Sequence, residues 1–283
     1  MAEWTSIIVE SRGGIARVTL NRAERRNAFD QRMVSELHEI FAQLTTNQTV
    51  RGVILTSAGP VFCAGADLCW LSQDNQLSIE QARHDARLLA GMYRIIDECP
   101  HPVIGRVQGN AFGGGVGLLA VCDVVVAVEE TMFTLSEVQL GLIPAVIAPF
   151  LLRKAGESFM RRFCLTAEPF SAVVAKQFGL VHEVMKTDQL DSRVEELADA
   201  IVRLGPDATR QTKALLRRLR AVPAGEQGSL SVEANAQARI GAEAQEGLRA
   251  FLEKRPPAWR QAKTDEESEP AHVTTRHGAG RRL

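Results

Sequence analysis

The stretch Gly109-Asn110-Ala111-Phe112-Gly113-Gly114-Gly115-Val116-Gly117-Leu118 constrains the fold more than any other part of the chain. It joins two mostly apolar runs, residues 102–107 and 122–128, that are typical of buried strands. Consecutive glycines let the backbone approach a ligand closely and adopt dihedral angles that side chains forbid. Residues 116–121 suit a short buried helix. The triple glycine would then lie at its N-terminus, where free N–H groups favour a negative charge.

An echo of this stretch lies fifty residues earlier. Laying residues 53–68 over 103–118 gives identical residues at six of sixteen positions (53/103, 54/104, 59/109, 62/112, 65/115 and 68/118). The pattern is that of a repeated strand–turn–helix unit. Two similar turns would then lie side by side, each offering backbone N–H groups to one pocket. Repeated ββα-like units favour a spiral over a doubly wound sheet.

The remaining elements follow from hydrophobic periodicity. Strands are predicted at 4–10, 15–20 and 52–57, with a hairpin turn at 11–14. Apolar residues recur at helical spacing from 33 to 44, and Ser78-Ile79-Glu80-Gln81 has the spacing of a capping box that opens a helix ending near Cys99. From about Ser158 the chain becomes helical, with helices expected at 171–178, 190–204, 207–220 and, as a pair, 231–254.

These elements predict an α/β core over residues 1–200, a helical assembly region over 201–260 and a disordered polar tail over 261–283. The formal net charge of -1 argues against dedicated nucleic-acid binding. Five cysteines without a C-x-x-C pair fit reduced thiols better than disulfides. No signal peptide or apolar run of membrane-spanning length is visible, so we expect a cytoplasmic protein without membrane attachment.

Several kinds of functional site are excluded because the sequence lacks the residues that they require. Val116-Gly117-Leu118 supplies neither the lysine nor the hydroxyl of a phosphate-binding Walker loop, and the glycine spacing differs from G-x-G-x-x-G. The six histidines are scattered; only His272 and His277 lie close together, in the tail, so no metal site is expected. The G-x-S-x-G turn of serine hydrolases is missing from the sequence.

After these exclusions, the remaining candidate ligand for the glycine turns is an oxygen atom that becomes negative only during the reaction. Backbone N–H groups without a nearby cation suit an oxyanion hole. Such a hole needs a group that moves protons, and Glu137 is the candidate because Leu and Val surround it in sequence. Burial would raise its pKa and suit a general acid or base. The pattern is equally compatible with a surface glutamate that begins a helix.

The residues just described resemble the crotonase (enoyl-CoA hydratase/isomerase) superfamily over roughly 5–259. The motifs that carry this resemblance are Asn21-Arg22 with Asn27-Ala28, Phe62-Cys63-Ala64-Gly65-Ala66-Asp67-Leu68, residues 109–123, residues 135–144, Gly179-Leu180-Val181 and Phe251-Leu252-Glu253-Lys254-Arg255.

The resemblance implies a crotonase-like ββα spiral core with a C-terminal helical trimerisation region, forming trimers or hexamers. It also implies an acyl-coenzyme A thioester as substrate, with no resident cofactor. The N–H groups of Ala66 and Gly114 would form the oxyanion hole. Ala28 and residues 64–68, including Ala64, Asp67 and Leu68, would hold coenzyme A. Lys254 resembles a lysine that reaches a CoA phosphate, often from a neighbouring subunit.

Two positions depart from the family pattern. Family hydratases usually carry a glutamate two residues after the triple glycine, where this chain has Gly117, so only Glu137 remains. The segment Ile143-Pro144-Ala145-Val146-Ile147-Ala148-Pro149 replaces the glycines that usually follow Ile-Pro, which would reshape the acyl pocket. One base suffices to move a proton along an allylic system, so the first departure alone favours a Δ3–Δ2 isomerase.

A narrower resemblance favours hydration. Residues 66–71, 108–117 and 141–147 are similar to bacterial methylglutaconyl-CoA and isohexenylglutaconyl-CoA hydratases, which act in leucine and acyclic terpene breakdown. We therefore expect a hydratase of short or branched 2-enoyl-CoA, with a Δ3–Δ2 isomerase or a non-catalytic CoA-binding protein as alternatives. Core packing is expected for Trp70 and Tyr93, and small apolar filling for Cys63 and Cys69.

Overall fold

The computed structural model describes residues 4–72 and 77–261. Its body is built on a six-stranded sheet of order β1-β2-β3-β4-β6-β9, in which β1 and β2 are antiparallel and the other neighbours parallel. The strands are β1 Ile7–Arg12, β2 Ile15–Leu20, β3 Gly52–Ser57, β4 Val103–Val107, β6 Val124–Val128 and β9 Glu183–Met185. Arg12 pairs with Ile15, so Gly13 and Gly14, with φ of +57° and +82°, form the turn of the predicted hairpin.

The fifty-residue repeat is confirmed by the register of the sheet. Strands β3 and β4 are neighbours, and Val53 pairs with Val103 and Ile54 with Ile104. A turn and a helix follow each strand, α2 (Leu68–Leu71) in the first unit and α4 (Gly114–Val121) in the second. The turns also touch, because the Phe112 N–H donates to the Cys63 carbonyl at 2.9 Å. The predicted adjacency of the two turns is therefore confirmed.

A second, three-stranded sheet lies beside these turns. It consists of β5 (Ala111–Phe112), β7 (Met132–Thr134) and β8 (Phe170–Ser171), in the order β5-β7-β8. In β5 and β7, Phe112 pairs with Thr134, so the chain after β7 passes directly beside the triple glycine.

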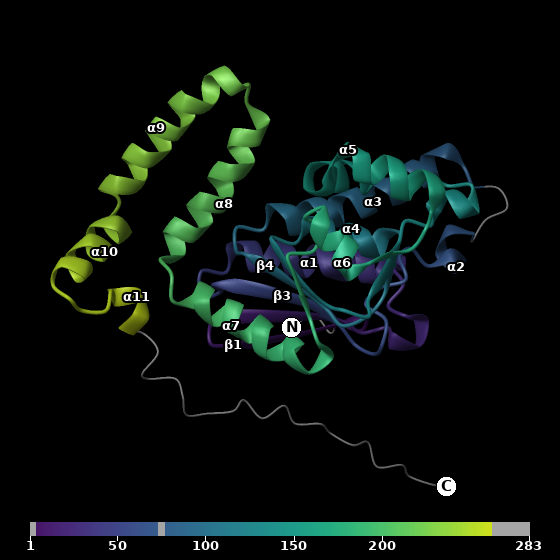
Figure 1. Ribbon diagram of the computed structural model, residues 1–283, viewed down its shortest axis with the longest axis horizontal. Coiled ribbons are helices and arrows are strands. Elements are labelled where there is room, and N and C mark those ends of the chain that lie inside the picture. The colour runs from purple at the N-terminus through teal and green to yellow at the C-terminus, as the bar shows by residue number, and fades with distance from the viewer. Residues whose placement is uncertain (1–3, 73–76, 262–283) are drawn as a thin grey trace, which may run out of the picture.

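Helices cover both faces of the large sheet (Figure 1). Those on one face are α1 Gln31–Thr46, α3 Ile79–Glu98, α4 and α5 Ala148–Thr166, while α7 Leu190–Val202 covers the other. Successive strand residues point to opposite faces, so Val53 and Leu55 enter the larger core and Ile54 packs beneath α7. A short helix, α6 (Ala172–Gln177), leads into β9.

The last helices leave the body as an arm, residues 206–261 (Figure 1). It comprises α8 Pro206–Ala221, α9 Ala224–Ile240, α10 Ala242–Leu252 and α11 Ala258–Gln261. Helices α8 and α9 bury no residue. Polar contacts tie α8 to the body, since the Lys213 ammonium pairs with Asp123 at 2.5 Å and donates to the His101 carbonyl at 3.1 Å. Asp123 also accepts the Val103 N–H, which is a structural role.

Most predicted helices are confirmed within a few residues, including the capping box at Ser78. One helix was not predicted: α5 spans Ala148–Thr166, whereas the helical region was expected to begin near Ser158 and its first helix at residue 171. Pro149 lies in the first turn of α5, where a proline is tolerated because the N–H groups there have no partner within the helix. The last pair also begins earlier than predicted, at Ala224. The division at residue 200 stays a prediction, and the tail from residue 262, with His272 and His277, lies outside the described residues. No helix in the described ranges is long and apolar enough to cross a membrane.

Candidate functional site

The two predicted oxyanion donors lie in the paired turns. Phe29 holds the first turn, since its N–H donates to Gly65 O and its carbonyl accepts the Asp67 N–H, both at 2.7 Å. These bonds leave the Ala66 N–H, between them in sequence, unused. Gly114 is the first residue of α4, where N–H groups have no partner within the helix. Within residues 4–72 and 77–261, neither the Ala66 nor the Gly114 N–H donates a hydrogen bond to another protein group.

Glycine is required where the two turns meet. A Cβ on Gly65 would lie 2.7 Å from the Phe112 carbonyl oxygen and 3.2 Å from the Gly114 nitrogen, and the φ of Gly65 is +82°. Any side chain there would push the turns apart. The close approach that the glycines predict is therefore confirmed.

Glu137 faces the same turn. It begins a short 3-10 helix, η2 (Glu137–Leu140), after β7, and the Gly113 N–H donates to the Thr134 carbonyl at 2.8 Å. A Cβ on Gly113 would lie 3.1 Å from Glu137 Oε1, so the carboxyl rests against this glycine. Its other oxygen, Oε2, is buried and has no hydrogen-bond partner in the part of the chain described. Burial raises the pKa of Glu137 above its usual 4.5. The residue starts a helix, yet its carboxyl is partly buried, which suits an acid/base group.

The space beside Gly117 is filled by apolar atoms. A Cβ on Gly117 would lie well inside 3.0 Å of the Ile147 side chain, and 3.1 Å from the Tyr93 ring. Ile147 is 3% exposed and Tyr93 1%. The two departures from the family pattern are therefore linked. The altered segment 143–149 supplies Ile147, whose side chain fills the space that a glutamate at position 117 would enter. Core packing is confirmed for Tyr93, and also for buried Trp70.

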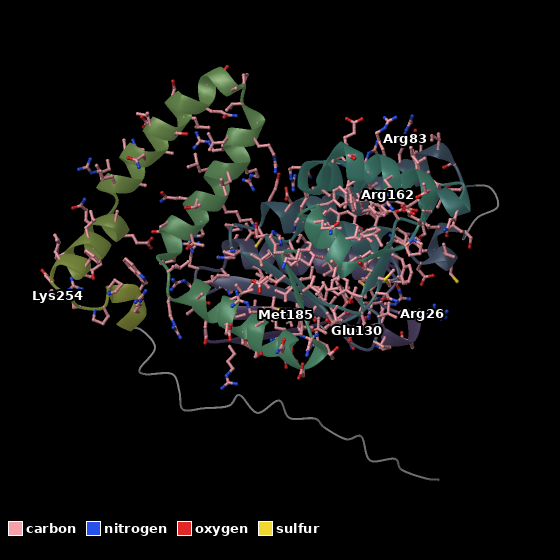
Figure 2. All side chains as sticks on the ribbon, viewed as in Figure 1. Arg26, Arg83, Glu130, Arg162, Met185 and Lys254 are labelled. Carbon is pink, nitrogen blue, oxygen red and sulfur yellow. The ribbon has the colours of Figure 1, made fainter. Side chains whose placement is uncertain are left out.

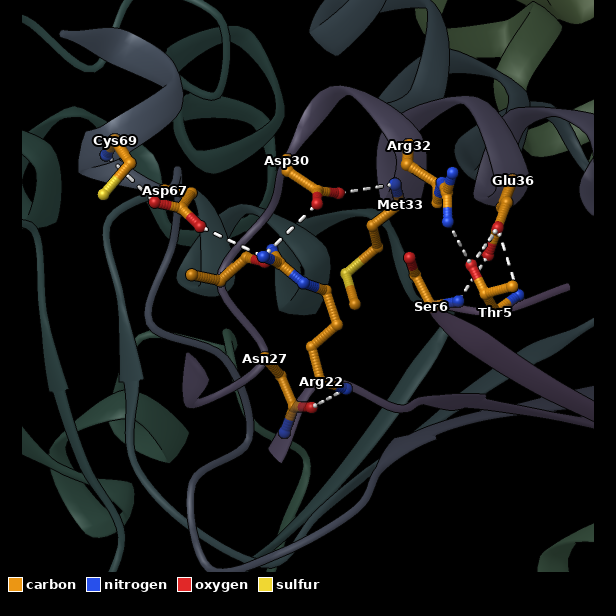
Figure 3. Close-up of polar contacts among 11 residues, drawn as sticks. Thr5, Ser6, Arg22, Asn27, Asp30, Arg32, Met33, Glu36, Asp67 and Cys69 are labelled. Carbon is orange, nitrogen blue, oxygen red and sulfur yellow. Dashed lines mark hydrogen bonds and ion pairs between the residues drawn. The ribbon is translucent and has the colours of Figure 1, made fainter. Parts of the chain in front are cut away.

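Most of the predicted coenzyme A residues lie in two loops that polar contacts join, Ala28 in the loop before α1 and Ala64 and Asp67 in the loop before α2. Ala64 N–H donates to Arg26 O at 2.9 Å, and Arg22 donates to Ala28 O at 2.5 Å. Asp67 accepts the Cys69 N–H at the start of α2 and pairs with Arg22 at 3.2 Å (Figure 3).

Arg22 also pairs with Asp30, so one guanidinium joins three segments of the site. The sequence motifs included Arg22 without indicating this role, because no local pattern predicts which distant carboxylates an arginine meets. Leu68 is 56% exposed, consistent with a contact to a ligand.

Lys254 is not brought to this site within one chain. Figure 2 shows it on the arm, on the opposite side of the molecule from Arg26. Among the cysteines, Cys63 fits the filling role, because it is buried and burial raises the pKa of its thiol to about 12. For Cys69 that expectation is wrong, since its position in α2 leaves it exposed.

Comparison with known proteins gives a consistent result. The family profile described as enoyl-CoA hydratase/isomerase matches residues 10–263. A putative enoyl-CoA hydratase of Thermus thermophilus is 35% identical over 247 residues, 87% of this chain and 97% of the relative. The mevalonyl-coenzyme A hydratase sidH of Aspergillus fumigatus is 35% identical over 253 residues, 87% of this chain and 91% of that protein. The crystal structure of an enoyl-CoA hydratase from Shewanella pealeana has a TM-score of 0.87 and 37% identity, covering 91% of this chain and 97% of that one.

The spiral of strand–turn–helix units and the helical arm define the crotonase class of fold, and the relatives define an enzyme of the hydratase-like lyase kind. The chain belongs to the enoyl-CoA hydratase/isomerase family.

Proposed function

We propose that this enzyme adds water to a short or branched 2-enoyl-CoA, with 3-methylglutaconyl-CoA as the leading candidate. Glu137 is the acid/base, and the Ala66 and Gly114 N–H groups stabilise the thioester enolate. The proposal rests on the buried Glu137 Oε2 beside Gly113 and on the neighbouring Gly114 N–H, neither of which has a hydrogen-bond partner among the described residues.

The reaction needs one carboxylate that acts twice. A water oxygen bonds to C3 while the Glu137 carboxylate takes one water proton, and the electrons of the double bond move to the thioester oxygen. The two N–H groups stabilise that oxygen; loss of one such donor costs about 10²–10³-fold in rate. Glu137 then returns the proton to C2, the carbonyl re-forms, and a 3-hydroxyacyl-CoA results. One carboxylate on one side of the acyl group implies that both additions occur on the same face.

Three lines of evidence support a branched substrate. Ile147 and Tyr93 occupy the Gly117 side and leave only apolar contact there for the acyl group. The Aspergillus fumigatus relative is named for a mevalonyl thioester, whose acyl group is branched at C3. The resemblance of segment 141–147 to methylglutaconyl-CoA hydratases points the same way.

We propose further that coenzyme A enters only as part of the substrate, held by Ala28, Ala64, Asp67 and Leu68, and that the enzyme has a cytoplasmic location. Five free cysteines suit a reducing compartment.

We also propose that the arm packs against other copies in a trimer or hexamer. Val232 and Phe251 on the arm are 72% and 82% exposed, and a hollow opens along α9 and α10 between Val232 and Gln245. Ile240 and Leu252 on the same arm are 73% and 80% exposed, and exposed apolar side chains that gather on one part of a molecule are typical of subunit contacts. Lys254 would then reach the CoA phosphate of a neighbouring subunit.

Assays of the wild type and of Glu137→Gln with 3-methylglutaconyl-CoA and crotonyl-CoA test the reaction. We expect hydration by the wild type with ¹⁸O from water in the product, and a rate loss of about 10²–10⁴-fold in the variant. Lack of turnover of both substrates by an assembled, CoA-binding protein would refute the proposal.

The alternatives give different results in the same assays. An isomerase, in which Glu137 moves a proton from C2 to C4 of a 3-enoyl-CoA, would convert that substrate without taking up ¹⁸O. A CoA-binding protein without catalysis would bind the thioesters and show no activity that Glu137→Gln removes.

A further inference from the structure

We propose that Phe29 and Tyr93 form a positioning pair that fixes the spacing and direction of the two amide donors, Ala66 and Gly114. Neither residue touches the reacting atoms in this arrangement. The inference rests on the proposed function, because it concerns the same oxyanion hole.

Tyr93 holds the Gly114 end. This residue lies on α3, outside the glycine turns, and its hydroxyl donates to the Gly114 carbonyl at 2.7 Å. A Cβ on Gly114 would lie 2.7 Å from the same hydroxyl oxygen. The Tyr93 ring also packs against Phe150 of α5, with ring centroids 6.0 Å apart. Gly114 is therefore anchored to a side chain whose own position is fixed from two helices.

Phe29 connects this end to the other donor. Its backbone makes the two hydrogen bonds that shape the Ala66 turn, and Phe29 and Ala66 form an isolated β-bridge. Its ring edge would lie 3.2 Å from a Cβ on Gly114 and meets the Tyr93 ring edge to face, at 6.4 Å between centroids and 81° between planes. One residue thus touches both turns, through its backbone on one side and its ring on the other.

The turns need such a restraint. Three successive glycines have more backbone freedom than any other tripeptide, while catalytic donors must be held within about 0.5 Å of their working geometry. Gly113 is held by Thr134, and Gly115 lies tightly against Cys63. The Gly114 N–H shares its peptide unit with the Gly113 carbonyl, which accepts the Val116 N–H at 2.9 Å, and the Tyr93 hydroxyl restrains the adjoining peptide unit through the Gly114 carbonyl. Without the hydroxyl, the adjoining peptide unit could tilt and shift the direction of the Gly114 N–H relative to the thioester oxygen, even though the fold persists.

Tyr93→Phe is the decisive variant, because it removes the hydroxyl and retains the packed ring. We expect kcat for hydration to fall about tenfold or more, less than the loss of a whole donor, while KM stays within about twofold. A matched control is Thr131→Val, since Thr131 is buried and its hydroxyl has no partner among the described residues. The control removes a buried hydroxyl away from the hole and is expected to leave kcat unchanged.

A spectroscopic readout separates positioning from stability and from the proposed reaction. Butanoyl-CoA carrying ¹³C at the thioester carbonyl cannot be hydrated, and hydrogen bonds to that carbonyl lower its infrared stretching frequency. We expect a lowered frequency in the wild type and in Thr131→Val, and a smaller shift in Tyr93→Phe. Phe29→Leu should reduce the shift as well, and the double variant should lose less than the sum, because the two residues act as a unit.

The outcomes are distinct. Unchanged kcat and unchanged carbonyl frequency in Tyr93→Phe would overturn the pair and leave Tyr93 as a packing residue. A shift that Tyr93→Phe weakens, in a protein that hydrates no substrate, would support the pair while refuting the proposed function. A wild type that leaves the carbonyl frequency unaltered would overturn both.

Discussion

The partly buried carboxyl of Glu137 determines how its charge affects stability. Because burial raises its pKa above 4.5, the folded state binds the proton more tightly than the unfolded state. Its contribution to stability is therefore present below the unfolded pKa and is lost as pH rises through the folded pKa. We expect the stability of Glu137→Gln relative to the wild type to increase with pH between 4 and 8. Urea unfolding at several pH values measures this, and a difference independent of pH would contradict it.

Gly117 provides a second test at the level of one residue. Alanine normally stabilises a helix by about 1 kcal/mol over glycine, but here its Cβ would collide with the side chain of Ile147. We expect Gly117→Ala to lower the free energy of unfolding by about 1–3 kcal/mol through overpacking. In an Ile147→Ala background, the additional cost of Gly117→Ala should be smaller, because the colliding side chain is gone.

The matched control is Gly228→Ala in α9, where a Cβ would meet nothing within 4 Å. It should be neutral or stabilising by about 0.5–1 kcal/mol. The denaturant midpoints of the variants measure these changes in stability. Equal changes for Gly117→Ala and Gly228→Ala would show that the contact with Ile147 is unimportant.

Single elements can be tested through the cap of α8. Gly205 precedes this helix and cannot provide a side-chain cap, and the Glu243 carboxylate of α10 accepts the Asp207 and Ala208 N–H groups at 2.9 and 2.7 Å instead. We expect Glu243→Ala to destabilise the first turn of α8 by about 0.5–2 kcal/mol, the usual cost of losing a cap.

Hydrogen exchange of the amides at the start of α8 measures the effect of Glu243→Ala. Glu226→Ala is the control, because Glu226 lies in the first turn of α9 and removes the same charge without a capping bond. Faster exchange in both variants would attribute the effect to charge alone.

Elements with a local signal were predictable from sequence. The β3–β4 register follows from the fifty-residue echo, because the two units repeat the same residues, and the start of α3 follows from the capping box, which spans four consecutive residues. Helix α5 was not predicted, since Pro149 and the preceding loop carry no clear helical period. The short strands of the second sheet are stabilised by partners distant in sequence, which no local pattern indicates.

The candidate site also contains features that local sequence motifs predict and features that depend on distant contacts. The glycine turns and Glu137 are visible as motifs, and the structure brings them together. The filling of the Gly117 side by Ile147 and the hydrogen bond from Tyr93 to Gly114 join segments that are far apart in sequence, so only the packed structure reveals them. The sequence indicated that the glutamate expected at position 117 is missing, and the packed structure shows that Ile147 fills its place.

For the whole molecule, the arm raises the question of how many chains build one site. Helices α8 and α9 bury no residue, and Lys254 lies on the opposite side of the molecule from Arg26, whose carbonyl accepts the Ala64 N–H (Figure 2). Under the proposed assembly, Lys254 contacts the phosphate of a CoA thioester that is bound to a neighbouring subunit. Lys254→Gln should then raise KM for the thioester several-fold in the assembled enzyme and leave kcat nearly unchanged, since the phosphate is remote from the reacting carbons.

Mixed assemblies distinguish a shared site from a site within one chain. Co-expression of Lys254→Gln with Glu137→Gln, each carrying a different affinity tag, gives oligomers that contain both variants. If each site takes Glu137 from one chain and Lys254 from its neighbour, random mixing leaves about one quarter of the sites intact, because each of two independent residues is native in about half of the chains. These sites should show the wild-type KM. If both residues come from one chain, no site is intact, and the mixture will follow the saturation curve of Lys254→Gln alone at reduced amplitude.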